Sequence, residues 1–187
     1  MKLGCVLMAS GAAVRFGSNK LLTQLEGKPL FRYAMETYSA VPFDRRVVVS
    51  RYAEILEAAP QYGFVPLPNS EAQEGVAASV RLGTLASGPM DGLLFAVCDQ
   101  PWLTPASVER LLDAFRQNPH KICSLAWEGN RGNPAIFPKE LFGELTTLSG
   151  DAGGGKVIRR HPELLLLVPA HRAHELSDVD TPEDLNA

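Results

Sequence analysis

The chain has 187 residues, of which 45% are hydrophobic and 21% are charged, and its formal net charge is −3. A chain of this length can bury a core without disulfides, and it predicts a single domain over residues 1–187. The slightly acidic balance argues against a dedicated nucleic-acid binder, and the apolar runs fall far short of the ~20 residues that span a bilayer.

Apolar runs typical of strands alternate along the chain with segments of helical periodicity. The expected strands are rich in Val and Leu, as strands covered on both faces are, and span Leu3–Met8, Arg46–Ser50, Gly63–Leu67, Gly92–Cys98, Ile122–Trp127 and Leu164–Val168. The expected helices lie between them, at Leu30–Tyr38, Ala53–Ala59, Val76–Leu85, Pro105–Gln117, Lys139–Leu148 and Gly155–His161. Thr104 before Pro105 is a favourable helix start, and Thr181 with Asp184 resembles a capping box. The alternation predicts an α/β fold with a mostly parallel sheet.

The first strand leads into a basic loop that contains Gly11, Arg15, Gly17 and Lys20. Small residues let the backbone approach a ligand closely, and exposed N–H groups beside fixed cations form an anion site. Such a loop suits a nucleoside triphosphate. The spacing is neither GxxxxGK[ST] nor GxGxxG, so an ordinary strand-to-helix turn with solvated cations stays an alternative.

Acidic and polar loops follow other expected strands. Asp99 ends the fourth strand, residues 129–134 form a Gly/Asn loop after the fifth, and Asp178 and Asp180 follow the last. Because ligands of open parallel sheets bind at the carboxyl ends of strands, these loops are expected to meet the basic loop at one edge. Two converging carboxylates there would suit Mg²⁺ bound to phosphates. Asp180 precedes Thr181-Pro182, however, so a role as a helix cap stays an alternative for it.

The three cysteines, Cys5, Cys98 and Cys123, lie far apart in apolar runs. The odd count and the absence of a CxxC pair favour buried, reduced thiols over a disulfide framework. The start, Met1 to Gly4, shows no signal-peptide pattern, so a cytoplasmic protein is expected.

Segments along essentially the whole chain resemble the MobA-like nucleotidyltransferase family and, within it, the molybdenum cofactor cytidylyltransferases. Residues 7–20 resemble the family opening LAAGxSxRMGxxK, and Asp99-Gln100-Pro101 matches a signature of the cytidylyltransferase branch. Residues 132–138 resemble its GNPVLF segment and residues 149–153 its SGDxGA segment. Residues 178–185 match its ending DIDTPEDL.

The resemblance implies a three-layer α/β/α, Rossmann-like (GT-A-like) nucleotidyltransferase fold. It also implies transfer of CMP from CTP, or of another nucleoside monophosphate, to the terminal phosphate of a molybdopterin-type acceptor, with release of pyrophosphate. The implied catalytic residues are Arg15, Lys20 and Asp99, and Mg²⁺ would be held by Asp99 and Asp180. The implied nucleotide-binding residues are Ala9, Ser10, Gly11, Arg15, Lys20, Gly75 and Ser79, and the acceptor-binding residues are Asn133 and Asp151. A transient contact with a molybdoenzyme or its chaperone would accompany this role, with no nucleic-acid or membrane partner.

The chain departs from the family pattern in places. Ala13 replaces the usual serine, which removes one hydroxyl that could bind phosphate, and Gly154-Gly155-Lys156 differs from the usual Ala-Arg pattern. Base choice rests on analogy, so a guanylyltransferase or a sugar-1-phosphate nucleotidyltransferase stays open. A non-catalytic cofactor-binding accessory and an α/β domain without such a site stay open too. The sequence also does not decide whether Asp178 joins Asp180 at the metal.

Overall fold

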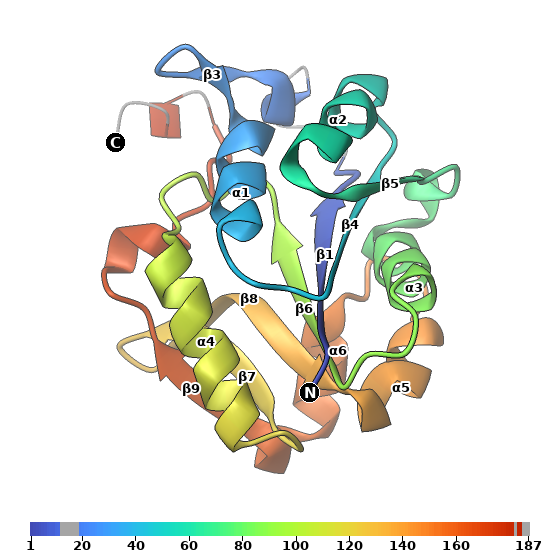
Figure 1. Cartoon of the computed structure of the whole chain (residues 1–187), viewed down its shortest axis with the longest axis vertical. Coiled ribbons are helices and arrows are strands. Elements are labelled where there is room, and N and C mark those ends of the chain that lie inside the picture. Colours follow the sequence, from blue (N-terminus) through green and yellow to red (C-terminus); the bar gives the residue numbers. More distant parts are fainter. Residues whose placement is uncertain (12–18, 182, 185–187) are drawn as a thin grey trace.

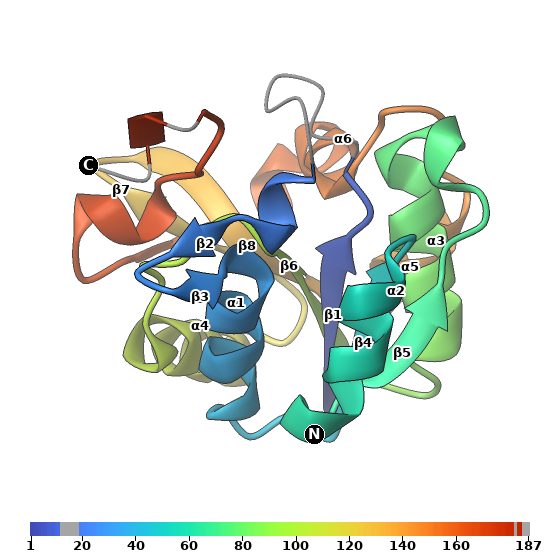
Figure 2. The same cartoon turned by 90° about the horizontal axis from the view of Figure 1, so that it is seen from above.

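The computed structural model describes residues 1–11, 19–181 and 183–184. Its centre is a seven-stranded sheet in the order β5-β4-β1-β6-β8-β7-β9, with helices on both faces (Figures 1 and 2). The strands are β1 (Leu3–Ala9), β4 (Arg45–Ser50), β5 (Val65–Pro68), β6 (Gly92–Val97), β7 (Ile122–Trp127), β8 (Asn130–Pro138) and β9 (Leu165–Pro169). Neighbouring strands of this sheet are parallel except where β8 pairs with β6 and β7. The predicted three-layer α/β/α fold with a mostly parallel sheet is confirmed.

Successive residues of each strand face opposite helix layers, as the strand period of two requires. Cys5 and Leu7 of β1 pack on the side of α1 (Leu30–Ser39), α2 (Ala53–Ala58) and α4 (Pro105–Gln117). Val6 packs on the side of α3 (Val76–Ala86), α5 (Phe142–Thr146) and α6 (Gly154–Arg160). Burial on both faces explains why the strands are continuous apolar runs in the sequence. The three cysteines are buried and free, as predicted.

The polar segment after β7 is a hairpin rather than the predicted Gly/Asn loop. Glu128 and Gly129 both have positive φ, at 47° and 80°, and they turn the chain so that Trp127 pairs with Asn130. β8 then begins at once and runs antiparallel between β6 and β7. Its first residues are exposed at the rim of the sheet, and only its second half is buried. A strand whose first half is solvated lacks the apolar run on which the prediction depended.

One further local prediction needed correction, and one small element was not predicted. The expected helix Lys139–Leu148 is a 3-10 turn, Lys139–Leu141, followed by the short helix α5. The small hairpin of β2 (Gln24–Leu25) and β3 (Lys28–Pro29) was not predicted, because each strand has only two residues. Among the described residues, no helix combines the length and the apolar character needed to cross a membrane.

The start of α4 is fixed by a buried carboxylate as well as by its cap. Thr104 caps the helix by accepting a hydrogen bond from the Ser107 N–H, as its position before Pro105 predicts. The side-chain hydroxyls of Thr104 and Ser107 both donate hydrogen bonds to the carboxylate of Glu175. This carboxylate also accepts a hydrogen bond from the His171 N–H at 2.9 Å. Burial alone would raise the pKa of Glu175, but these hydrogen bonds outweigh it, and the net pKa is lowered.

A lowered folded-state pKa predicts that Glu175 stabilises the fold above the ordinary glutamate pKa of about 4.3 and that this contribution is lost as the pH falls through the lowered value. Glu175→Gln should therefore reduce the free energy of unfolding at pH 7 by about 1–3 kcal/mol. The deficit relative to the unmodified protein should shrink on acidification. Denaturant titrations of both proteins at several pH values measure this, and a deficit that does not change with pH would contradict it.

Candidate active site

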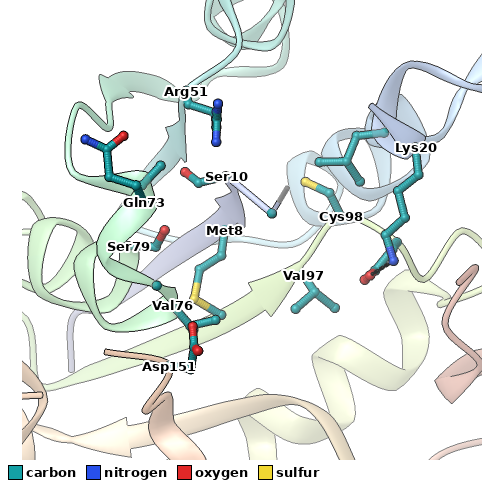
Figure 3. Close-up of a pocket in the computed structure, with 15 residues that line it drawn as sticks. Met8, Ser10, Lys20, Arg51, Gln73, Val76, Ser79, Val97, Cys98 and Asp151 are labelled. Carbon is teal, nitrogen blue, oxygen red and sulfur yellow. Dashed lines mark ion pairs between the residues drawn. The ribbon is translucent and has the colours of Figure 1, made fainter. Parts of the chain in front are cut away.

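The carboxyl ends of β1 and β6 open into a cavity of about 520 Å³. β1 leads directly into Ser10 and Gly11, and β6 leads into Cys98 and Asp99. The cavity is lined by Met8, Ser10, Gly11, Lys20, Leu21, Arg51, Ala72, Gln73, Gly75, Val76, Ser79, Val97, Cys98, Asp99 and Asp151 (Figure 3). Segments far apart in the sequence therefore meet at the sheet edge where ligands of parallel sheets bind.

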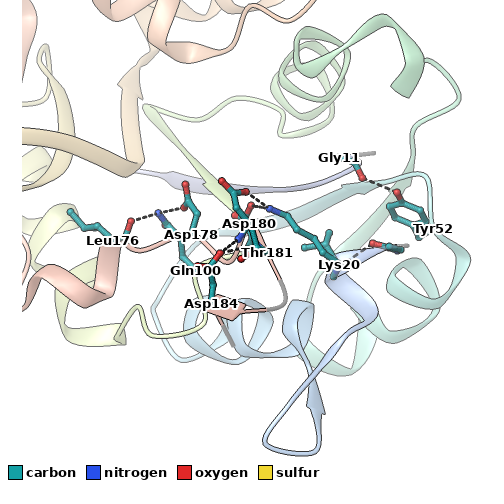
Figure 4. A network of polar contacts seen from close by, with 12 residues as sticks. Gly11, Lys20, Tyr52, Gln100, Leu176, Asp178, Asp180, Thr181 and Asp184 are labelled. Atoms are coloured by element: carbon teal, nitrogen blue, oxygen red, sulfur yellow. Dashed lines mark hydrogen bonds and ion pairs between the residues drawn. The ribbon is translucent and has the colours of Figure 1, made fainter. Parts of the chain in front are cut away.

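The ammonium of Lys20 joins two of the predicted acidic residues. Its Nζ lies 2.7 Å from Asp99 Oδ2 and 2.9 Å from Asp180 Oδ1 (Figure 4). Burial by itself would lower the pKa of Lys20, but the hydrogen bonds and charges of the two carboxylates outweigh it and raise the pKa. Lys20 therefore stays positively charged near neutral pH, and in this structure its ammonium lies between the two acidic loops.

Asp178 lies beside this cluster and is held by Gln100. The Gln100 side-chain amide donates to Asp178 Oδ1 at 2.8 Å and to the Leu176 carbonyl at 3.2 Å. Burial, and then the charge of Asp99, raise the pKa of Asp178. The glutamine of the Asp-Gln-Pro motif thus fastens the loop that carries Asp178 and Asp180 to the end of β6. A backbone bond from the Val179 N–H to the Asp99 carbonyl, at 2.8 Å, reinforces this link.

The donor set suits a hard divalent cation. Asp99 and Asp180 converge on one positive charge, and Asp99 Oδ1 is buried without a hydrogen-bond partner among the described residues. Within the same part of the chain, no group of three His, Cys, Asp or Glu side chains is arranged to hold a metal. Two carboxylates with an incomplete protein shell match the preference of Mg²⁺, which keeps waters and shares substrate phosphates.

A buried amide organises the other end of the cavity. Asn69 donates to the hydroxyls of Ser10 and Ser79, both at 3.1 Å, and its Oδ1 accepts the Glu71 N–H. The Ser10 hydroxyl in turn donates to the Val49 carbonyl. Among the described residues nothing accepts the proton of Ser79, so this hydroxyl is a donor available to a ligand.

Gly75 brings the loop before α3 against the loop before α6. Its φ is +97°, and a Cβ at this position would lie 2.4 Å from Asp151 Oδ1 and 2.6 Å from the Gly150 carbonyl. The Gly150 carbonyl also accepts the Ala77 N–H at 3.1 Å. Asp151, predicted from the resemblance as an acceptor residue, therefore shares a cavity with the predicted nucleotide residues.

Not every predicted site residue reaches the cavity. Asn133 lies on β8, inside the strand rather than in the predicted loop, and it does not line the cavity. Ala9 is buried at the end of β1, where its carbonyl accepts the Ser50 hydroxyl at 2.9 Å. Arg15 lies outside the described residues, as does Ala13.

The lining also includes residues that were not predicted as site residues, and Met8, Arg51 and Gln73 are examples. Arg51 comes directly after β4, so the rule that ligands bind at strand carboxyl ends could have found it. Met8 is an ordinary apolar strand residue, and Gln73 lies in a short 3-10 turn. Neither carries a signal that separates it from structural residues.

Residues 5–164 match the MobA-like NTP transferase domain family. The chain belongs to this family. The matched range contains Ser10, Lys20 and Asp99, whereas Asp180 lies beyond it. Membership of this family implies an NTP substrate.

Named relatives cover nearly the whole chain. It is 30% identical over 192 residues to nicotine blue oxidoreductase of Paenarthrobacter nicotinovorans, an alignment that covers 96% of this chain and 93% of that protein. It is 24% identical over 204 residues to a probable molybdenum cofactor guanylyltransferase of Pyrococcus horikoshii, covering 100% of this chain and 98% of that protein.

Solved structures share the fold. Rv0371c of Mycobacterium tuberculosis H37Rv superposes with a TM-score of 0.80 at 26% identity, covering 100% of this chain and 97% of that one. A structure of Rv0371c in complex with manganese superposes with the same TM-score of 0.80 at 22% identity and the same coverage. The seven-stranded α/β architecture is thus shared with both of these solved structures.

Proposed function

We propose that residues 1–187 act as one nucleotidyltransferase domain that moves CMP from CTP to the terminal phosphate of a molybdopterin-type cofactor. The observation that carries the proposal is that Lys20 contacts both Asp99 and Asp180, and that Lys20 and Asp99 line a cavity in a MobA-like NTP transferase. A cation and two carboxylates beside a glycine-containing loop are the groups that a metal-bound triphosphate requires.

In the proposed reaction the acceptor's phosphate oxygen attacks the α-phosphorus of CTP. A new P–O bond forms as the bond to the β-phosphate oxygen breaks, and pyrophosphate leaves with the electron pair. A phosphate monoester is already largely ionised near neutral pH, so no general base is required. Catalysis then consists of positioning and of neutralising charge.

Different residues of the proposed site position the substrates and neutralise their charge. Lys20 and Arg15 neutralise the triphosphate, and backbone N–H groups of the first loop orient it. Asp99 and Asp180 would hold Mg²⁺, which when bound neutralises phosphate charge and activates the α-phosphorus as a Lewis acid. Asp151 and Asn133 are assigned to the acceptor side.

Cytosine is favoured as the base by two features. The Asp-Gln-Pro motif and the DVDTP ending resemble the cytidylyltransferase branch, and Gln100 links these two motifs through Asp178. In addition, the hydrogen-bond chain through Asn69 leaves the Ser79 hydroxyl as a donor. A hydroxyl donor there suits the acceptors O2 and N3 of cytosine.

The experiment is pyrophosphate release by the purified protein with Mg²⁺, the molybdopterin acceptor and each of CTP, GTP and UTP in turn. We expect release with CTP, dependence on the acceptor, and loss of release in EDTA. Preference for GTP would replace the proposal with a guanylyltransferase, and turnover on a sugar 1-phosphate would replace the acceptor. Nucleotide binding without release from any pair would indicate a non-catalytic accessory.

An oxidoreductase is a second candidate, because the relative from Paenarthrobacter nicotinovorans carries that name at 30% identity. The two activities leave different products. Reduction of nicotine blue by an added reductant, without pyrophosphate release from any NTP, would favour the oxidoreductase and exclude the transferase proposal.

A further inference from the structure

Lys20 occupies the position between the two carboxylates that are proposed to hold the metal. Its Nζ contacts Asp99 Oδ2 at 2.7 Å and Asp180 Oδ1 at 2.9 Å, and only 15% of its side chain is exposed. Asp178, whose Oδ1 accepts a hydrogen bond from the Gln100 amide at 2.8 Å, adds a third acidic group close by (Figure 4). Without a cation among them, these acidic groups would repel one another.

We propose that Lys20 is a resident cation that holds Asp99 and Asp180 together until a divalent metal takes its place, and that its ammonium is then free for the triphosphate. The inference rests on the proposed function, because it assumes that these carboxylates form the metal site. It adds an exchange in which Lys20 first pairs with the two carboxylates and then, once the metal is bound, with the triphosphate.

The exchange follows from charge and space. A divalent cation that binds the same carboxylate oxygens cannot share them with an ammonium about 3 Å away, since two positive charges at that distance repel strongly. Lys20 can move because its charge sits on a flexible four-carbon stem with rotatable donors. Lys20 lines the cavity together with Ser10 and Gly11, so the released ammonium would stay within the site that is proposed to take the phosphates.

The consequence is coupling between metal and nucleotide. A metal that displaces Lys20 makes a cation available to the triphosphate, and a triphosphate that attracts Lys20 uncovers the carboxylates. Such coupling is reciprocal by thermodynamic linkage. The nucleotide-free protein should therefore bind metal weakly, because the ion pairs of Lys20 oppose it.

The first test measures Mn²⁺ binding to the nucleotide-free protein by the loss of the free Mn²⁺ electron paramagnetic resonance signal. Lys20→Gln should bind Mn²⁺ about tenfold more tightly than the unmodified protein, which corresponds to ~1.4 kcal/mol. Arg51→Gln is the matched control, because Arg51 is a cation that lines the same cavity but lies beside Ser10, away from Lys20 (Figure 3). Its Mn²⁺ affinity should change less than about twofold. Equal or weaker binding by Lys20→Gln, or no binding by either protein, overturns the proposal.

The second test follows Lys20 itself. Acylation of lysines by acetic anhydride, mapped by mass spectrometry, should increase at Lys20 when Mn²⁺ is added. Lys28 is the internal reference, because it is also ion-paired, to Glu36 at 2.5 Å, and lies outside the cavity. Unchanged reactivity of Lys20 with Mn²⁺ bound would overturn the exchange. Neither test uses turnover, so failure of the exchange and failure of the proposed transferase activity are distinguishable.

Discussion

Asp99→Asn should lower the rate of pyrophosphate release about 10²- to 10³-fold while the protein stays folded. Asp99 follows β6 and carries both an oxygen on Lys20 and a buried oxygen without a partner in the described part of the chain. The amide keeps the size of the side chain but removes the negative charge that a metal or an ammonium requires. Lys20 retains Asp180, so its ammonium keeps a charged partner when the ion pair with Asp99 is lost.

Asp113→Asn is the matched control for this substitution. Asp113 forms an exposed ion pair with Arg116 on α4 and does not line the cavity. It should leave both turnover and the melting temperature nearly unchanged. Full turnover of Asp99→Asn under the same conditions would remove Asp99 from the catalytic site, and unfolding of that variant would show that its role is structural.

The layers and the site edge were predictable because the signals are local and regular. β1, β6 and β7 are nearly continuous apolar runs, as is typical of strands that are covered on both faces. Once the sheet is parallel, the loops after its strands must meet at one edge. The proximity of Lys20, Asp99 and Asp180 follows from that rule.

What the sequence did not reveal depends on contacts between distant segments. β8 begins with exposed polar residues, so its pairing with β6 and β7 leaves no apolar pattern at its start. The approach of Gly75 to Asp151 depends on how two loops pack, and neither loop has a periodicity that reports it. Likewise, no pattern shows that Lys20 contacts the carboxylates rather than solvent.

Gly75→Ala should reduce kcat/KM for the nucleotide by about 10²-fold, since small displacements of positioning groups have effects of that size. Gly75 has φ +97° and ψ −170°, a region that essentially only glycine adopts. A methyl group there would lie 2.4 Å from Asp151 Oδ1 and 2.6 Å from the Gly150 carbonyl carbon and oxygen. The loop before α3 and the loop before α6 must therefore separate, which also disturbs the bond from the Ala77 N–H to the Gly150 carbonyl.

Gly88→Ala separates the effect of the contact from that of backbone strain. Gly88 also has a positive φ, +73°, but a Cβ there meets nothing within 4 Å. The left-handed conformation costs an alanine about 1–2 kcal/mol, so Gly88→Ala should lower the melting temperature without raising KM. Kinetics and thermal denaturation of both variants, measured in parallel, distinguish the two effects. If Gly75→Ala matched Gly88→Ala in kcat and KM, the contact between the two loops would have no part in holding the nucleotide, and Asp151 would have to be assigned to the fold alone.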